Sequence, residues 1–423
     1  MTDDANKALT PKLRFPDFQE QPSWEYRPLA KLGDIITGKT PNTKDLDLWG
    51  GDILFITPTD ISADGKYQHT TARKVVESGS TRVLPAGSIV YTCIASIGKM
   101  ALTVRASITN QQINSVVVNP SVDGEYVYYA LSNLTPWIQS IPATSTLPII
   151  NKSEFSKILV AVPSAVVEQQ KIAECLSTLD ELIVATSQKL DALKAHKKGL
   201  MQQLFPREGE TVPRLRFPEF HEAPEWEERR VGELGDVLAG KALAVNALGP
   251  QRPYLRTKNV LDGAIDLSDV RTMPMTDAEF SRFEIFNGDV LLNEGQSLEL
   301  VGRASIYRGE FGGRCAIQNQ LLRFRAFPST SPEFAAQVFR QCQQDGTFTE
   351  IATKTTSIAH LGSSRFSALA LPWPSPAEQH RIATCLSSLD ELIAAQSDKL
   401  GSLKAHKKGL MQQLFPSPAE AVE

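Results

Sequence analysis

The stretch that decides the fold of this chain occurs twice. Residues 168–206 read EQQKIAECLSTLDELIVATSQKLDALKAHKKGLMQQLFP, and residues 378–416 read EQHRIATCLSSLDELIAAQSDKLGSLKAHKKGLMQQLFP. Nine of the 39 aligned positions differ, so 30 are identical. The offset of 210 residues is far too long for a solenoid, whose repeats span about 20–50 residues. The chain is therefore predicted to contain two tandem copies of one unit.

Both copies have apolar residues at steps of three and four, the seam of a helix that packs along another helix. Two seam positions in each copy are polar instead, at Thr186 and Lys197 in the first copy and at Gln396 and Lys407 in the second. Polar seam residues fix the register and partner of paired helices. The residues predicted for helix pairing and partner docking are Ile172, Leu176, Leu179, Ile183, Leu190, Leu193, Leu200, Leu204, Ile382, Leu386, Leu389, Ile393, Leu400, Leu403, Leu410 and Leu414.

Each helix is predicted to begin just after a Pro-Ser turn, at residues 163–164 and 374–375, and to end at Phe-Pro, because proline cannot continue a helix. At 1.5 Å per residue each rod would be about 58 Å long. The identity extends over all faces of the helix and not only along the seam. This favours a surface that each copy presents to the same kind of external partner, with the copies antiparallel about a pseudo-two-fold axis.

A second repetition lies outside the helices. The sequence LRFPDF at 13–18 returns as LRFPEF at 215–220, whereas residues 40–85 and 242–285 share almost nothing. Mixed α/β (α+β) domains are predicted, with the chain divided at 1–162 (first domain with an N-terminal segment), 163–207 (central helix), 208–373 (second domain) and 374–423 (C-terminal helix and tail). The expected strands are 53–56, 88–91, 101–104, 114–118, 290–292 and 321–324, and the expected domain helices lie near 126–138 and 332–343.

Composition is that of an ordinary globular protein, with 42% hydrophobic and 22% charged residues. The net charge of −4 means that a DNA-binding protein of this kind would need a locally basic surface. The five cysteines form no C-x-x-C pair and are expected to be reduced thiols of a cytoplasmic protein. No apolar run approaches the ~20 residues of a membrane span, and the first residues lack the pattern of a signal peptide. No membrane association is predicted.

One motif could mislead. Residues 33–40 match the phosphate-binding pattern G-x-x-x-x-G-K-[ST], which requires a preceding strand and a following helix. Pro41 follows at once, and the equivalent position in the second half is Ala242. A glycine turn whose lysine contacts a DNA phosphate is favoured over an ATP site.

Metal and cofactor sites are not expected either. His196 and His406 have no second ligand nearby in the sequence, so no metal is predicted. The chain has no G-x-G for a cofactor loop, and neither a cofactor nor catalytic residues are expected.

These features together resemble the specificity subunit of a type I restriction–modification system. The likeness rests on the doubled E-Q-[QH]-[KR]-I-A run at Glu168 and Glu378, the doubled LDELI, the doubled KKGLMQQLFP, and the G-K-T-P run at 38–41. It covers essentially the whole chain. The second half departs from the pattern, because G-K-A-L at 240–243 stands where the G-x-T-P turn would lie, and this turn is expected to differ.

The resemblance implies two target-recognition domains, each followed by a long helix, with the helices paired as an antiparallel coiled coil. Each domain would read one half of a bipartite, asymmetric site on double-stranded DNA. The helices would act as a spacer and dock two methylating (modification) subunits, with translocase–endonuclease (restriction) subunits joining for defence against phage. The chain itself would be a targeting subunit without catalytic activity.

Loop residues that carry polar groups are the candidates for DNA contact, since Gln and Asn pair with adenine and Arg with guanine. The predicted contacts are Lys39, Thr40, Thr57, Thr59, Gln111, Gln112, Thr144, Ser145, Thr146, Arg256, Lys258, Asn259, Gln296, Arg303, Gln318, Lys354, Thr355, Thr356 and His360. Two other classes of protein stay open at this point: a coiled-coil interaction scaffold without a nucleic-acid role, and a P-loop enzyme. Duplex binding that falls steeply with salt separates DNA recognition from the scaffold.

Overall fold

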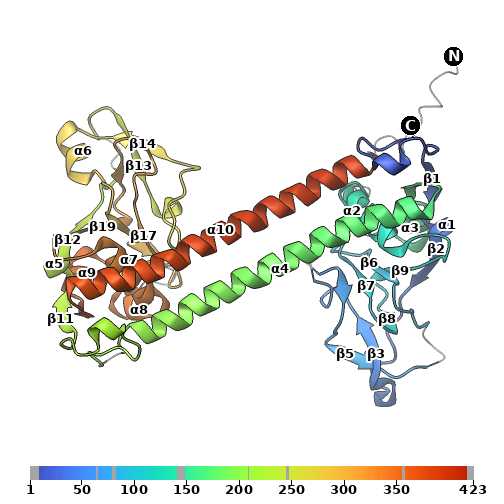
Figure 1. Ribbon diagram of the computed structural model, residues 1–423, viewed down its shortest axis with the longest axis horizontal. Coiled ribbons are helices and arrows are strands. Elements are labelled where there is room, and N and C mark those ends of the chain that lie inside the picture. The colour runs from blue at the N-terminus through green and yellow to red at the C-terminus, as the bar shows by residue number, and fades with distance from the viewer. Residues whose placement is uncertain are drawn as a thin grey trace. The chain divides into compact units, whose positions relative to one another are not determined.

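The computed structural model describes residues 9–62, 65–78, 82–140, 148–207, 209–243, 247–354 and 358–416 (Figure 1). The chain folds into two compact units. Unit 1 is Met1–Ser187 with Asp398–Glu423, and unit 2 is Gln188–Ser397. Each unit therefore combines one globular domain with the start of one long helix and the end of the other.

Unit 1 is built on a sheet with strand order β2-β9-β6-β7-β4, a second sheet β5-β3-β8 and the pair β1-β10. All described pairings are antiparallel except β4 with β7 and β3 with β8. The elements are η1 Pro16–Phe18, β1 Glu25–Pro28, α1 Leu29–Leu32, β2 Gly33–Thr37, η2 Leu46–Leu48, β3 Trp49–Ile56, β4 Tyr67–Gln68, β5 Arg73–Val75, β6 Ile89–Thr92, β7 Met100–Thr103, β8 Ser107–Thr109, β9 Ile113–Val118, α2 Gly124–Ser140, α3 Lys152–Lys157 and β10 Leu159–Val162.

Unit 2 contains the sheets β12-β19-β15-β17, β14-β13-β18 and β16-β21-β20 and the pair β11-β22. Its elements are η3 Pro218–Phe220, β11 Glu227–Arg230, α5 Val231–Leu234, β12 Gly235–Ala239, β13 Gln251–Leu255, η4 Thr257–Asn259, β14 Arg271–Pro274, α6 Asp277–Phe283, β15 Val290–Asn293, β16 Gly295–Gln296, β17 Ala304–Ile306, β18 Ala316–Ile317, β19 Leu321–Ala326, α7 Pro332–Gln344, α8 Thr347–Ile351, β20 Thr353–Lys354, β21 Ala359–His360, α9 Ser363–Ala368 and β22 Ala370–Trp373.

The two domains share a topology that their sequences hide. The order β2-β9-β6-β7 in unit 1 matches β12-β19-β15-β17 in unit 2, and β5-β3-β8 matches β14-β13-β18. The parallel pair in the smaller sheet is also repeated, as β3 with β8 and β13 with β18. The smaller sheet arises in part from residues 40–85 and 242–285, where the two halves share almost no sequence. Burial of alternate apolar residues is enough to specify such strands without sequence identity.

The expected elements overlap observed ones, with ends that shift by at most a few residues. The six predicted strands fall on β3, β6, β7, β9, β15 and β19, and the two predicted domain helices fall on α2 and α7. Ser331 caps the start of α7 by accepting a hydrogen bond from the Phe334 amide, and proline occupies the first turn, where it needs no amide partner. The predicted domain ends at 162 and 373 are the last residues of β10 and β22.

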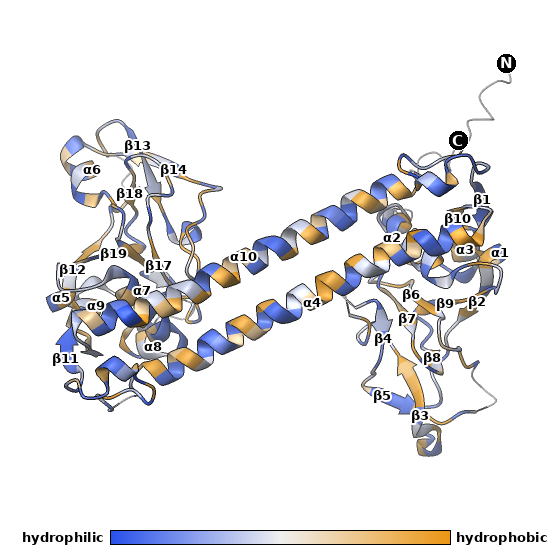
Figure 2. Cartoon of the chain, in the orientation of Figure 1, coloured by the Kyte–Doolittle hydropathy of each residue, from blue (hydrophilic) through white to orange (hydrophobic). Residues whose placement is uncertain are grey.

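The long helices are α4 Val166–Leu204 and α10 Pro376–Leu414, each 39 residues long. They begin just after the Pro-Ser turns and end just before Phe-Pro, as predicted. Gln169 and Gln379 fold back over these turns, since their Nε2 atoms donate to the carbonyl oxygens of Pro163 and Pro374 at 3.0 and 2.9 Å. Figure 2 shows polar and apolar residues alternating along both helices. Within the described part of the chain, no helix is both long and apolar enough to cross a membrane.

The helix segments inside each unit run antiparallel. In unit 1, the Leu13 amide donates to the Gln413 carbonyl near the end of α10, while the neighbouring Arg14 binds Glu168 near the start of α4. Further along, Asp180 of α4 binds Lys407 of α10. Unit 2 has the same arrangement with the helices exchanged. The helix ends also enter the domain cores: unit 1 buries residues 411, 414 and 415, and unit 2 buries residues 201, 204 and 205.

Candidate nucleic-acid interface and helix seam

The predicted seam residues are turned inward. The buried ones are Ile172, Leu176, Leu190, Leu204, Ile382, Leu386 and Leu414, and the half-buried ones are Leu179, Ile183, Leu193, Leu200, Leu389, Ile393, Leu400, Leu403 and Leu410. By contrast, the second leucine of each LDELI motif is exposed, at Leu182 and Leu392. The helices thus bury one apolar stripe and show the same two leucines to solvent.

The doubled glutamate that opens each helix is a buried anion held by the doubled LRFP segment. Arg14 binds both carboxylate oxygens of Glu168 at 2.7 and 2.8 Å, and Arg216 binds those of Glu378 at 2.8 Å each. Both glutamate side chains are 1% exposed. The hydrogen bonds that Arg216 donates to Glu378 raise the pKa of Arg216. These bidentate pairs explain why the two motifs occur together in each half, although about 160 residues separate them.

The two other doubled motifs also bind each other. The lysine of the seam, Lys197, is 4% exposed, and its Nζ contacts both carboxylate oxygens of Asp390 from the second LDELI at 2.6 and 2.7 Å. In unit 1 the equivalent ion pair joins Lys407 to Asp180 of the first LDELI. The two seam lysines therefore form cross-helix ion pairs, and a polar seam residue with a fixed partner sets the register of paired helices.

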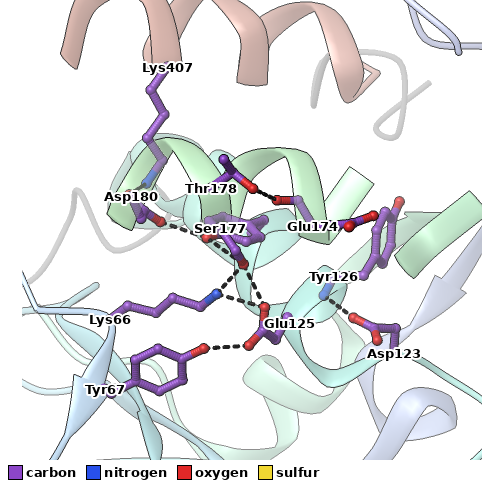
Figure 3. Close-up of polar contacts among 11 residues, drawn as sticks. Lys66, Tyr67, Asp123, Glu125, Tyr126, Glu174, Ser177, Thr178, Asp180 and Lys407 are labelled. Carbon is purple, nitrogen blue, oxygen red and sulfur yellow. Dashed lines mark hydrogen bonds and ion pairs between the residues drawn. The ribbon is translucent and has the colours of Figure 1, made fainter. Parts of the chain in front are cut away.

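The ion pair of unit 1 belongs to a larger network, shown in Figure 3. The Tyr129 hydroxyl of α2 donates to Asp180 at 2.6 Å. Lys66, which precedes β4, donates to Glu125 of α2 at 2.7 Å and to Ser177 of α4 at 2.5 Å. We call the six residues Lys66, Glu125, Tyr129, Ser177, Asp180 and Lys407 the first polar hub. Burial and the hydrogen bond to Asp180 raise the pKa of Tyr129, so its hydroxyl stays protonated.

Unit 2 has a corresponding second polar hub, formed by Lys197, Asp262, Gln337, Arg340 and Asp390. Gln337 accepts from Lys197 at 3.0 Å and donates to Asp390 at 2.8 Å. Arg340 bridges Asp262 at 2.7 Å and Asp390 at 3.1 Å. Burial raises the pKa of Asp390, but the nearby charges of Arg340 and Lys197 outweigh it, so the net pKa lies below the ordinary value. Burial is the largest influence on Lys197 and lowers its pKa.

In unit 1, several predicted DNA contacts lie together at one end of the domain. We call this end, residues 38–40, 57–60, 94–99 and 110–112, the first loop cluster. The Thr40 hydroxyl donates to Gln111 Oε1 at 2.8 Å, which joins two of the loops. The hydroxyls of Thr57 and Thr59 are 2.9 Å apart. Lys39, Thr59 and Gln111 are exposed and the other predicted contacts described here are half-buried. Lys39, Thr40, Thr57, Thr59, Gln111 and Gln112 thus share one surface.

A lysine missed by sequence reasoning joins this surface. The exposed Lys99 donates from Nζ to the Pro58 carbonyl at 3.3 Å and so lies beside Thr57 and Thr59. Ala95 in the same loop has φ of 62°, a left-handed conformation that is rare outside glycine and is concentrated at functional sites. The sequence offered one signal for Lys99: it lies in the loop between the predicted strands 88–91 and 101–104. The predicted contacts Thr144, Ser145 and Thr146 lie outside the described residues.

Unit 2 gathers its candidates in a corresponding place, the second loop cluster, residues 240–241, 256–260, 294–303, 318–320 and 358–361. Backbone hydrogen bonds join these loops, from Gln318 to Leu255, from Glu294 to Gln320 and from Leu361 to Glu294. Arg303 donates to the Thr257 carbonyl at 3.5 Å, and burial lowers its pKa. His360 Nδ1 lies 3.1 Å from Glu294. Gln296 is half-buried on β16, next to β21. Lys354 is exposed on β20, and Thr355 and Thr356 lie outside the described residues.

The second loop cluster continues into a basic surface. Arg256, Lys258 and Arg271 all approach the carboxylate of Asp269, so three cations share one anion. Lys258 and Arg271 are exposed. The hydrogen bond from Lys258 is the largest cause of the lowered pKa of Asp269. Arg271 was not predicted, because it follows a divergent stretch without a motif. An excess of exposed cations is what contact with DNA phosphates requires.

Two predicted contacts have surroundings that disfavour base reading. Asn259 is 1% exposed, and its amide is engaged by the Arg256 amide and by the carbonyls of Asp266 and Asp269. It therefore holds the loop that carries the basic surface. Gln318 is 9% exposed, whereas Asn319 and Gln320 beside it are exposed. Side chains that fold inward in this way organise loops more readily than they reach a base edge.

The P-loop alternative is wrong on geometry. Residues 33–37 are themselves a strand, preceded by the helix α1 and followed by a loop. A phosphate loop needs the opposite order, with a strand before it and a helix after it. Lys241, the equivalent of Lys39, forms an ion pair with Glu279. Among the described residues, no group of three or more His, Cys, Asp or Glu side chains is placed to hold a metal ion.

Comparison with known proteins decides the family. The sequence profile of the type I restriction modification DNA specificity domain matches residues 22–195 and again residues 224–405. The chain belongs to the type I restriction–modification specificity family. Each match runs from a globular domain into its long helix. The predicted fold class, a mixed α/β chain of two tandem domains with long helices, is confirmed, and the resemblance drawn from the doubled motifs is confirmed with it.

Relatives within the specificity family support this assignment. The chain is 30% identical over 268 residues to the type I restriction enzyme MjaIX specificity subunit of Methanocaldococcus jannaschii, an alignment that spans 58% of this chain and 60% of that protein. It is 23% identical over 416 residues to the MjaVIII specificity subunit of the same organism, which covers 95% of this chain and 93% of that one. The crystal structure of a type I restriction–modification S subunit from M. genitalium shares the fold, with a TM-score of 0.64 at 16% identity, covering 97% of this chain and 100% of that one.

Proposed function

We propose that this chain reads a bipartite, asymmetric sequence in double-stranded DNA for a type I restriction–modification complex. The observation that best supports this proposal is that two domains with the same topology present two different loop clusters. The first offers Lys39, Lys99 and threonine hydroxyls, and the second offers Arg256, Lys258 and Arg271. Different side chains contact different base edges, so each domain reads its own half-site.

The helices have a separate role in this proposal. Helices α4 and α10 pair along their length as an antiparallel coiled coil with pseudo-two-fold symmetry, and this pair acts as the spacer between the half-sites. The same exposed leucine occurs in both LDELI motifs, at Leu182 and Leu392, within near-identical surroundings. Two equivalent surfaces fit two copies of one methylating subunit, and translocase–endonuclease subunits complete the complex. In this proposal the chain directs the complex to its DNA sequence and has no catalytic activity of its own. It acts in the cytoplasm, where its five cysteines stay reduced.

The function is tested by mapping modified bases in host DNA with the chain present and deleted, while the partner subunits are retained. The expected result is a split, asymmetric adenine-methylation motif that disappears with the chain. The matched control restores the chain from a plasmid, which must restore the same motif. A methylated motif that persists after deletion would contradict the proposal. Binding of the co-expressed complex to duplex DNA separates the proposal from a scaffold role, because a scaffold would show no sequence-dependent binding.

A sharper prediction concerns the basic surface of unit 2. The double variant Lys258→Ala/Arg271→Ala is expected to flatten the plot of log affinity against log salt by about 1.8, since each lost phosphate contact on duplex DNA contributes roughly 0.9. Sequence preference at the second half-site should change little, because phosphate contacts carry no base information. Fluorescence anisotropy of the co-expressed complex from low to moderate salt measures this slope. Lys152→Ala/Lys157→Ala on α3 removes the same charge elsewhere, and an equal flattening there would refute the assignment.

A further inference from the structure

A short segment in the divergent part of each domain contacts residues that bind the long helices. In unit 1, residues 57–72 connect β3 to β5 and contain Lys66. In unit 2, residues 256–270 connect β13 to β14 and contain Asp262. In the sequence, Lys66 directly follows an Asp-Gly dipeptide, and Asp262 is the first residue of another. We call these stretches the linking segments. Their sequences differ, yet each contributes one residue to the polar hub of its own unit.

The first linking segment is fastened to the helices by a buried cation. The Lys66 side chain is 8% exposed and donates to Glu125 and Ser177, while the adjacent Tyr67 hydroxyl donates to the other oxygen of Glu125 at 2.5 Å (Figure 3). The Lys66 carbonyl also accepts from the Leu102 amide at 2.8 Å, which ties the segment to β7. Glu125 has a pKa below its ordinary value: burial, the largest influence, raises it, but the hydrogen bonds from Lys66 and Ser177 prevail.

The second linking segment uses the opposite polarity. Asp262 is the anion on the segment, and it pairs with Arg340 of α7, whose side chain is 12% exposed. Arg340 also binds Asp390 of α10 and so links the segment to that helix. Gly263 has φ of 71°, and a Cβ there would lie 3.1 Å from the Arg340 guanidinium, so the turn closes tightly on the arginine. Lys197 on α4 and Gln337 on α7 complete the second polar hub.

Each linking segment also carries predicted DNA contacts. Thr57 and Thr59 precede Lys66 on the first segment, with Asp60 binding the Thr57 amide and hydroxyl. On the second segment, Arg256 and Lys258 precede Asp262 by only a few residues. We therefore expect a change at Lys66 or Asp262 to shift the predicted DNA contacts on the same segment, which internal hydrogen bonds order between Asp60 and Thr57 and between Asn259 and Asp266.

We propose that the two polar hubs position the DNA-contact residues on the helices and so set the distance the complex requires between its half-sites. Lys66 and Arg340 are positioning residues for recognition, and they contact no base themselves. The inference rests on the proposed reading of a bipartite DNA target. The two linking segments also differ in polarity, because the segment supplies the cation of its contact in unit 1 and the anion in unit 2.

The test uses the complex co-expressed with its methylating subunits and a DNA library in which the half-sites are constant and the spacer varies by single base pairs. Wild type is expected to methylate one spacer length. Lys66→Met and Arg340→Met should each lower the ratio of methylation at that length to methylation at its neighbours by about tenfold, the effect of losing one charge-assisted hydrogen bond. The half-site bases should stay unchanged. Lys157→Met at an exposed residue and Arg229→Met at a half-buried one, whose side chain is 40% exposed, remove the same charges and should leave the ratio unaltered.

A rescue variant keeps the test decisive if a single change prevents folding. Lys66→Glu/Glu125→Lys restores the ion pair with reversed charge and should recover strict spacing, whereas Lys66→Glu alone sets two carboxylates together. Slower methylation with unchanged spacer preference in Lys66→Met and Arg340→Met would overturn the inference and leave the hubs a purely structural role. Absence of site-specific methylation by wild type at every spacer would instead contradict the proposed function.

Discussion

Replacing Arg216 with alanine is expected to lower the free energy of unfolding of unit 2 by about 3–5 kcal/mol, because it strands a buried carboxylate. Glu378 is 1% exposed and accepts two hydrogen bonds from Arg216, which also donates to the carbonyls of Ala223 and Pro224. The single change removes the cation and leaves four acceptors without that partner. Hydrogen exchange of the amides in β15 and β19 against urea concentration measures the effect within this unit.

Two control variants make this prediction specific. Arg229→Ala also removes ion pairs, with Glu227 and Glu233, but water reaches all three side chains, which are 40%, 79% and 53% exposed, so a change of no more than about 1 kcal/mol is expected. Arg216→Met/Glu378→Leu replaces the whole pair by apolar groups and should recover most of the loss, since removing both partners leaves no buried charge. If Arg216→Ala were as mild as Arg229→Ala, Glu378 would have to be hydrated or protonated in the folded protein.

The substitution Phe334→Ala is expected to lower the free energy of unfolding of unit 2 by about 3–5 kcal/mol, the typical loss when a large aromatic residue in a core is truncated. Phe334 is fully buried at the start of α7, and its ring centroid lies 5.0 Å from that of Trp373, 5.8 Å from that of Phe205 and 5.9 Å from that of Trp226. These rings come from α7, β22, the end of α4 and the segment before β11. One side chain therefore joins the domain to the helix end.

The same hydrogen-exchange measurement applies to Phe334→Ala, with tryptophan fluorescence as a second readout because two of the contacting rings are indoles. Phe327→Ala is the matched control, since that ring is 43% exposed and should matter little. Phe334→Leu should fall between the two, because it retains much of the buried volume. A loss at Phe327 equal to that at Phe334 would show that the ring cluster is not the centre of this core.

The sequence alone predicted the two long helices, the domain helices α2 and α7, and six of the 22 described strands, and it proposed DNA contacts that remain predictions. The helix bounds followed from periodicity and the flanking prolines, which are local signals. Lys39, Thr40 and Gln111 were chosen as polar loop residues, and the structure places them on one surface. Asn259 met the same criterion yet lies buried, and Arg271 met none yet lies in the basic surface. Burial depends on the neighbouring segments, so it cannot be read from a single loop.

What the sequence determined by itself was the existence of two equivalent units, each with a long helix that has an apolar seam, since a repeat of 39 residues with this periodicity has few other solutions. Only the tertiary structure decided which repeated motifs bind each other. Asp180 and Lys407 are 227 residues apart, and Arg14 and Glu168 are 154 apart. The opposite polarities of the contacts made by the two linking segments are likewise invisible in the sequence. Such contacts leave no local pattern, because they form only after the chain has brought distant segments together and removed their charges from water.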